Sequence, residues 1–128
     1  MRPISYALLR IAAGVLFFEH GAQKLFGWMG GFSASGGTAD LMTRFGVAGV
    51  LEVAGGVLLA LGLFTRPVAL LLVGEMLVAF YLAHLPRGGW PVQNQGELAL
   101  LYASIFAFFA AHGAGRFSVD ARLGGRWR

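Results

Sequence analysis

The chain has 128 residues, of which 57% are hydrophobic and only 12% are charged. An ordinary soluble domain carries roughly 25% charged residues and, at this length, still exposes about a third of the surface of its unfolded chain. So few charges cannot cover that exterior, which excludes an ordinary soluble domain and indicates a membrane protein with one domain, residues 1–128. The chain has no cysteine, which excludes disulfides, thiolate redox chemistry and cysteine metal sites.

The net charge of +4 does not indicate a nucleic-acid partner. Basic residues are spread along the chain and gathered at its tail, without a platform of aromatic and basic residues on one face. A basic tail beside apolar segments instead suits the head groups of anionic membrane lipids. We therefore expect membrane lipid as a partner, and no nucleic acid.

Four apolar segments follow one another, at about residues 4–26, 46–64, 67–85 and 96–111. A helix needs about 20 residues to cross a hydrocarbon core of about 30 Å. The segments are too long for strands and do not alternate. The sequence therefore predicts an all-α, integral membrane four-helix bundle. The first segment contains ionisable residues and does not end in an A-x-A cleavage site, so we expect it to be retained rather than removed as a signal peptide.

The connections between the segments suit helices. Thr65-Arg66-Pro67 ends the second helix and puts proline in the first turn of the third. Residues 86–91 form a turn with an interfacial tryptophan. The connection 27–44 is longer and rich in glycine, and it predicts a short interfacial helix at about 39–44 or a re-entrant segment.

Glycine is abundant inside the helices. In the second helix Gly49, Glu52 and Gly56 share one face, and Gly55 and Gly62 share another. Small residues allow the backbones of two helices in a membrane to approach closely. We predict that these glycines serve helix packing.

The arginines of the loops predict the orientation. With both ends of the chain in the cytoplasm, only Arg44 and Arg87 lie outside. The cytoplasmic side then holds six arginines: Arg2, Arg66, Arg116, Arg122, Arg126 and Arg128. This is the asymmetry of the positive-inside rule, so we expect cytoplasmic N- and C-termini.

Ionisable residues inside the predicted spans need partners, because a charge at the bilayer centre costs roughly 2.5 to 3.5 kcal/mol. Depth counted at about 1.5 Å per residue places them in two layers. The inner layer predicts a structural ion pair between Arg10 and Glu75. Glu75 and His84 are nine residues apart and point in nearly opposite directions on a straight helix, so we expect them not to share a pocket.

The outer layer gathers polar side chains from all four helices: His20, Gln23, Lys24, Glu52, His84 and Glu97. His20 and Lys24 are four residues apart and share a face. Glu52 is too deep for its short side chain to reach water, so it must pair, stay protonated or line a hydrated cavity. We predict that this layer binds a ligand, although Lys24 and Glu97 could also be interfacial anchors. No histidine pair has the spacing of a helical zinc site, and we expect no metal.

Motifs along most of the chain resemble those of the DoxX family of small four-helix membrane proteins. The first helix has Arg10 and the run FEHGAQKLFG at 18–27, and the second has EVAGGVLLALGLFTR at 52–66. The third has Glu75-Met76 with His84, and the fourth has Gly96-Glu97 followed by GAGRFSVD at 113–120. Leu98 replaces the aromatic residue that often lies beside the fourth-helix glutamate.

The resemblance implies a multi-pass protein of the bacterial inner membrane. Relatives include a membrane subunit of a thiosulfate:quinone oxidoreductase, and others are linked to redox stress or to detoxification of small aromatic compounds. The leading hypothesis is a redox-associated membrane subunit that binds a quinone or another small lipophilic molecule in the outer half of the bundle. Because the chain has no cysteine and no evident cofactor motif, electrons would come from a soluble or membrane oxidoreductase.

The alternative hypothesis is a non-enzymatic protein, which would be a transporter, a lipid-binding module or an assembly partner. In that case the polar layer binds a substrate or only fastens the helices. A bound quinone is the one cofactor that the first hypothesis requires. Whether the protein is an enzyme, and whether it forms a homo-oligomer, both stay open.

Overall fold

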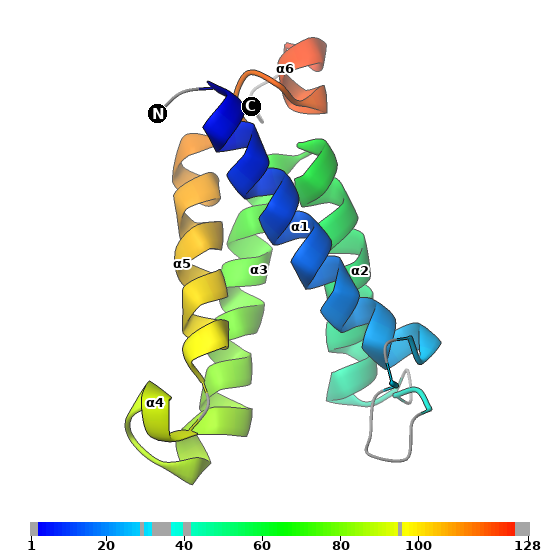
Figure 1. Ribbon diagram of the computed structural model, residues 1–128, viewed down its shortest axis with the longest axis vertical. Coiled ribbons are helices and arrows are strands. Elements are labelled where there is room, and N and C mark those ends of the chain that lie inside the picture. The colour runs from blue at the N-terminus through cyan, green and yellow to red at the C-terminus, as the bar shows by residue number, and fades with distance from the viewer. Residues whose placement is uncertain (1–2, 29, 32–36, 40–41, 95, 125–128) are drawn as a thin grey trace.

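The computed structural model describes residues 3–28, 30–31, 37–39, 42–94 and 96–124. Its four long helices are α1 (Pro3–Phe26), α2 (Arg44–Leu61), α3 (Thr65–Ala79) and α5 (Glu97–His112). α3 continues into a π-helical turn, η1 (Phe80–His84), and a 3-10 turn, η2 (Leu85–Arg87). Two short helices, α4 (Pro91–Asn94) and α6 (Val119–Leu123), lie at opposite ends of the molecule (Figure 1). All regular structure in the described residues is helical, so the predicted all-α class is confirmed.

α1, α2 and α5 begin and end within three residues of the expected bounds, and so does the third helix when η1 and η2 are counted with α3, which itself ends six residues early, at Ala79. Two helical segments among the described residues are long and apolar enough to cross a membrane, Arg44–Leu61 and Thr65–Arg87. Only 17% of the apolar window in Thr65–Arg87 is buried, whereas the core helix of a soluble protein is mostly buried. α1 is not one of the two, and it contains Arg10, Glu19 and Lys24. α5 is apolar but has only 16 residues.

The ends of α2 show why the helix has these bounds. The Thr43 hydroxyl accepts a hydrogen bond from the Gly46 N–H at 3.3 Å and so caps the first turn. Gly62 ends the helix with a φ of 71°, a left-handed conformation that favours glycine. A Cβ atom at Gly62 would also lie 2.5 Å from the Ser118 Cβ, so there is no room for a side chain there.

α1 and α2 form an antiparallel hairpin that is built on four glycines. A Cβ atom at Gly14 would lie 2.7 Å from the Gly56 carbonyl oxygen, and one at Gly21 would lie 2.8 Å from the Gly49 carbonyl oxygen. Each pair is spaced seven residues apart along its helix, so the backbones touch twice along one crossing. The structure therefore confirms the predicted packing role of Gly49 and Gly56.

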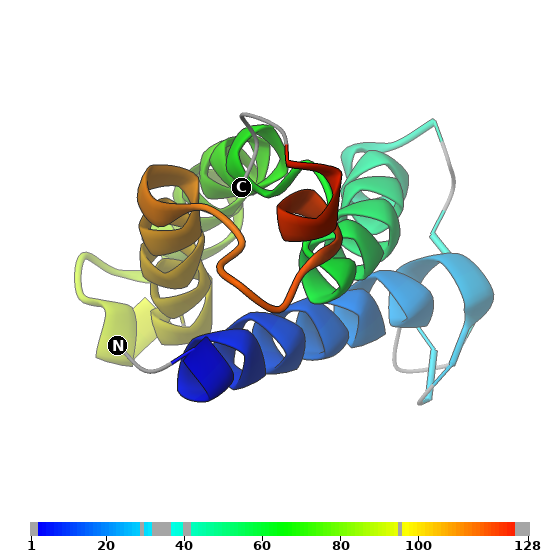
Figure 2. The same cartoon turned by 90° about the horizontal axis from the view of Figure 1, so that it is seen from above.

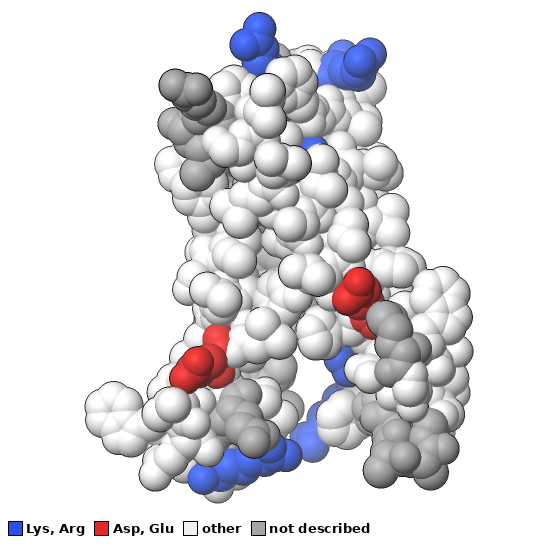
Figure 3. Space-filling model, in the orientation of Figure 1, with Lys and Arg blue, Asp and Glu red and all other residues white. Residues whose placement is uncertain are grey.

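α3 and α5 form a second antiparallel hairpin. Its interface with α1 is aromatic, since Phe17 contacts Phe106 edge-on at 4.8 Å between ring centroids. Phe106, Phe109 and Leu72 are almost completely buried. The two hairpins lie close together at the α6 end and diverge toward the α4 end (Figure 1). A space-filling view shows a hollow between them at that end (Figure 3).

The predicted ion pair between Arg10 and Glu75 does not form. The Arg10 guanidinium donates to the carbonyl oxygens of Leu59 at 3.0 Å and Ala60 at 3.3 Å, in the last turn of α2. It also donates to Ala114 and Phe117, at 2.6 and 2.9 Å, in the segment after α5. Carbonyls in the last turn of a helix have no partner within it, so a buried guanidinium can be satisfied without any carboxylate. The long Arg10 side chain therefore reaches the α6 end, whereas Glu75 lies ten residues into α3.

The segment after α5 folds back across the α6 end of the bundle (Figure 2). The Asp120 carboxylate accepts the N–H groups of Phe64 and Thr65 at 2.8 and 2.9 Å, and so caps α3 from outside the helix. The Asp120 N–H in turn donates to the Gly62 carbonyl at 2.9 Å. The segment 113–123 is therefore fastened to three of the four long helices.

The expected interfacial helix at about 39–44 includes residues 40 and 41, which lie outside the described residues. Ala39, Met42 and Thr43 are not helical, and α2 begins at Arg44. The Ala39 N–H donates to the Lys24 carbonyl at 2.7 Å, so this point of the connection lies against the end of α1.

Candidate functional site

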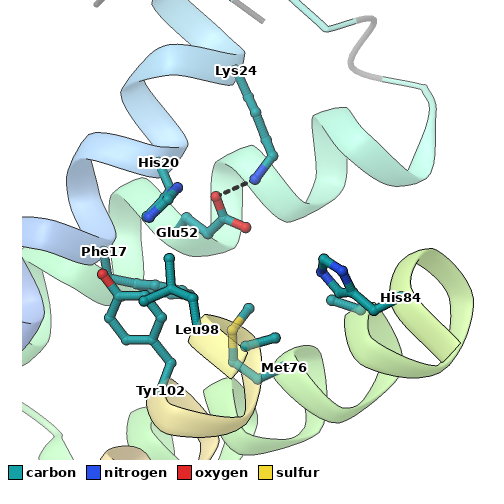
Figure 4. Close-up of a pocket in the computed structure, with 10 residues that line it drawn as sticks. Phe17, His20, Lys24, Glu52, Met76, His84, Leu98 and Tyr102 are labelled. Carbon is teal, nitrogen blue, oxygen red and sulfur yellow. Dashed lines mark hydrogen bonds and ion pairs between the residues drawn. The ribbon is translucent and has the colours of Figure 1, made fainter. Parts of the chain in front are cut away.

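A cavity of about 250 Å³ lies between the two hairpins, in the half of the molecule away from α6. We call it the inter-hairpin cavity. All four long helices and the π-turn contribute to its lining: Phe17, His20, Lys24, Glu52, Met76, Ala79, His84, Leu98, Ala99 and Tyr102. Four of the six predicted ligand-binding residues therefore line one space, with polar groups on the first hairpin facing mainly apolar ones on the second (Figure 4).

Lys24 and Glu52 form a salt bridge at one side of the cavity. The Lys24 Nζ lies 2.6 Å from the Glu52 Oε1 (Figure 4). The Glu52 side chain is almost completely buried, whereas that of Lys24 is 21% exposed. The glycine crossing brings the two helices close enough for this contact, because Gly49 packs directly against the Lys24 and Leu25 side chains. Of the three alternatives left open for Glu52, the structure shows pairing beside a cavity.

Glu75 lies next to this pair rather than beside Arg10. The ionisable groups that act on its carboxyl are Glu52 and Lys24. Both Glu75 carboxyl oxygens are buried and have no hydrogen-bond partner among the described residues. Three ionisable side chains from three helices thus share one region, but Glu75 is not part of the cavity lining.

The π-helical turn η1 affects the direction of His84. A straight α-helix would turn His84 away from the face that carries Met76 and Ala79. A π-helical turn contains more residues than an α-helical one, so it rotates the residues that follow it. His84, at the end of η1, faces the cavity from the side opposite Lys24 (Figure 4). π-helical turns inside α-helices are frequently found at functional sites.

Three residues of the lining were missed by sequence reasoning: Met76, Leu98 and Tyr102. Tyr102 is buried, and its ring lies edge-on to the His20 ring at 5.9 Å between centroids. It adds a hydroxyl group to the cavity. A tyrosine in an apolar helix is an ordinary packing residue, and the one available signal was its position five residues after Glu97.

Two predicted site residues do not line the cavity. Glu97, the first residue of α5, is exposed and is not part of the cavity lining. Gln23 is partly buried but does not reach the cavity. The cavity therefore brings together fewer residues than the six that we expected in the outer layer.

Comparisons with known proteins decide the family. The family model for DoxX matches residues 5–85, which is more than half of the chain. The chain belongs to the DoxX family. An uncharacterised protein of Haemophilus influenzae is 40% identical over 126 residues, covering 95% of this chain and 92% of that protein. The inner membrane protein YphA of Escherichia coli is 34% identical over 85 residues, covering 65% of this chain and 61% of YphA. No solved structure matches.

The family and the exposed apolar helices agree that this DoxX protein is a membrane protein. The matched residues 5–85 contain His20, Lys24, Glu52, Glu75 and His84. α5 and the closing segment 113–123 lie beyond the family match, but the Haemophilus relative aligns over almost the whole chain.

Proposed function

We propose that this DoxX protein crosses the bacterial inner membrane four times, with both termini in the cytoplasm. α1, with 24 residues, is about 36 Å long and crosses the bundle obliquely, so a tilt accommodates it (Figure 1). α5 is about 24 Å long and is extended at its N-terminal end by the turn around Trp90. Arg66, Arg116 and Arg122 lie at the α6 end, which favours that end as the cytoplasmic one. The name of YphA supports the inner membrane.

The inter-hairpin cavity, in the outer half of this arrangement, would bind a quinone or a similar small lipophilic molecule with a polar head. The observation that carries this proposal is the composition of the lining. Lys24, His20 and Tyr102 can donate hydrogen bonds, and Phe17, Met76 and Leu98 offer apolar contacts. A quinone ring has the complementary character, because it is a flat apolar ring with two carbonyl acceptors.

The size of the cavity limits the ligand. Pockets for drug-sized ligands measure roughly 300 to 1,000 Å³, so about 250 Å³ suits a single substituted ring rather than a whole lipid. An attached isoprenoid chain would have to leave the cavity where the hairpins diverge. Quinone reduction consumes protons, and Glu52 and Glu75 are carboxyl groups close to the head group that could hold them. Electrons would come from an oxidoreductase partner, which makes this chain a redox-associated subunit.

The proposal can be tested with duroquinone, a tetramethylated benzoquinone, and with durene, which has the same carbon skeleton without carbonyls. Calorimetric titration of the detergent-solubilised protein should show saturable binding of duroquinone and much weaker binding of durene. Lys24→Met should weaken duroquinone binding by about tenfold or more, because it removes a charged donor. Tyr102→Phe should weaken it less, because a neutral hydrogen bond contributes less.

Glu97→Gln is the matched control, since Glu97 is a carboxylate at the same end of the bundle but outside the lining. It should leave duroquinone binding unchanged. Equal binding of durene and duroquinone would show that the carbonyls are not recognised. Copurification of a lipid, with no duroquinone binding, would favour the non-enzymatic lipid-binding alternative.

A further inference from the structure

A second cavity, of about 370 Å³, lies at the α6 end of the molecule. We call it the arginine cavity. The end of α2 forms one wall and the closing segment forms the other: Ala60, Leu61, Arg116, Phe117, Ser118, Val119 and Arg122. It shares no residue with the inter-hairpin cavity, and the two lie at opposite ends of the bundle.

The two walls of the arginine cavity are fixed to each other. One nitrogen of the Arg10 guanidinium donates to the Ala60 carbonyl at 3.3 Å on the first wall and to the Phe117 carbonyl at 2.9 Å on the second. The Ser118 hydroxyl accepts the Ala121 N–H at 3.1 Å and holds the turn between Arg116 and Arg122. The cavity is therefore formed by the protein itself, before any ligand binds.

The charge around the arginine cavity is positive. The side chains of Arg116 and Arg122 are exposed at its rim, and Arg10 adds a third cation behind its walls. Asp120 is the one carboxylate in the closing segment, and it is buried with both oxygens bonded to the N–H groups of Phe64 and Thr65. Its negative charge is thus bonded to the start of α3.

Apart from Ser118, the rest of the lining is apolar. Leu61 is 50% exposed and Phe117 is 52% exposed, so both present apolar surface beside the arginines. Exposed apolar side chains add nothing to the binding free energy of a free anion in water. An anion with an attached hydrocarbon chain would gain binding free energy from the arginines and from the apolar side chains, because the hydrocarbon chain covers the exposed apolar side chains.

We propose that the arginine cavity binds the phosphate head group of an anionic phospholipid from the leaflet on the α6 side. Arg116 and Arg122 hold the phosphate, and an acyl chain descends along Leu61 and Phe117. Basic pockets between membrane helices on the cytoplasmic side are a recognised way to bind such head groups. The bound lipid would brace the closing segment against α2. This site does not depend on the ligand of the inter-hairpin cavity.

The test uses native mass spectrometry of the full-length protein in a neutral detergent, with phosphatidylglycerol and phosphatidylcholine of identical acyl chains. The protein should retain phosphatidylglycerol in preference to phosphatidylcholine. The pair of changes Arg116→Gln and Arg122→Gln should weaken phosphatidylglycerol retention by about tenfold or more. The pair Arg44→Gln and Arg87→Gln removes the same charge from the opposite end and should leave retention unchanged. Arg116→Lys with Arg122→Lys keeps the charge and should retain most of the lipid.

Equal retention of the two lipids by the wild-type protein would overturn the proposal, whatever the variants do. Equal loss in both glutamine pairs would also overturn it, because it would show general attraction to the bilayer surface. Inorganic phosphate serves as the soluble probe. If it displaced phosphatidylglycerol at comparable concentrations, the site would recognise a free anion and not a lipid.

Discussion

The two ends of the bundle satisfy their buried charges in different ways. At the α6 end, Arg10 and Asp120 are bonded entirely to backbone groups, with four carbonyls on the arginine and two N–H groups on the aspartate. At the other end, Lys24 and Glu52 bond to each other, both Glu75 carboxyl oxygens are buried with no hydrogen-bond partner among the described residues, and the inter-hairpin cavity lies beside the pair. The difference indicates that the buried charges at the α6 end hold the fold together, whereas the charged groups beside the inter-hairpin cavity are available to a ligand.

Arg10 should show the largest effect on stability. Arg10→Met removes a donor from four carbonyls, two at the end of α2 and two in the closing segment, and of these only Leu59 keeps a second donor among the described residues, the Gly62 N–H. We expect a loss of roughly 3 to 5 kcal/mol in the free energy of unfolding. Thermal unfolding in detergent measures it. Arg66→Met is the control, because Arg66 donates to the exposed Ala111 carbonyl, and its loss should cost less than about 1 kcal/mol. Equal losses of stability in Arg10→Met and Arg66→Met would show that the buried arginine does not stabilise the fold more than the exposed one.

Gly56 should come next, because it lies at one of the two close contacts of the α1–α2 crossing. A Cβ atom there would lie 2.7 Å from the Gly14 carbonyl oxygen and 2.8 Å from the Phe18 nitrogen, and neither backbone atom can move aside alone. We expect Gly56→Ala to cost about 1 to 3 kcal/mol. Gly74→Ala is the matched control, since nothing lies within 4 Å of that Cβ position. A stable Gly56→Ala protein would mean that the two helices do not cross so closely.

Asp120 should have a moderate effect, as caps do. Asp120→Ala leaves the N–H groups of Phe64 and Thr65 without acceptors at the start of α3, and we expect a loss of about 1 to 2 kcal/mol. Asp120→Asn keeps one acceptor oxygen and should lie between the alanine variant and the wild-type protein. If asparagine and alanine destabilise the protein equally, the charge and not the cap would be what matters.

Glu75 should have the smallest effect on stability. Because Arg10 is satisfied without it, and because both Glu75 oxygens are buried without a hydrogen-bond partner among the described residues, Glu75→Gln should not lower the free energy of unfolding. The double variant Arg10→Met, Glu75→Gln should show additive effects, as distant sites do. If Glu75→Gln recovered part of the loss caused by Arg10→Met beyond its own effect in the wild-type protein, the two residues would interact, as the sequence predicted.

Much of the fold could be predicted from the sequence because hydropathy acts locally. Hydropathy places the second helix at about 46–64, within three residues of α2, and Gly49 and Gly56 show which face another helix approaches; the caps Thr43 and Gly62, which set the observed ends, were not part of the prediction. The partner of Arg10 could not be predicted, because counting depth along the helices only indicates which charged side chains lie at the same level. It does not indicate that carbonyl groups at a helix end are available as acceptors. The direction of the His84 side chain depends on a π-helical turn, and no sequence pattern predicted that turn.

The site was predictable only where its residues are ionisable. His20, Lys24, Glu52 and His84 are conspicuous in apolar helices, and all four line the cavity. Tyr102, Met76 and Leu98 carry no such signal, because tyrosine, methionine and leucine are ordinary in a packed membrane helix. Glu97 was predicted to be part of the site from its depth alone, but a residue in the first turn of a helix can point outward as easily as inward.

Glu52→Gln tests most directly whether the charged residues beside the inter-hairpin cavity serve ligand binding, while Arg10 and Asp120 at the α6 end serve stability. Glutamine keeps the shape and an acceptor oxygen for Lys24 but removes the charge and the exchangeable proton. The melting temperature and the duroquinone affinity should be measured on the same preparation, with Glu97→Gln beside it. We predict an unchanged melting temperature and duroquinone binding weakened by about tenfold, through loss of the salt bridge that orients Lys24. Wild-type affinity in a stable Glu52→Gln protein, or a collapse in stability like that of Arg10→Met, would contradict the account.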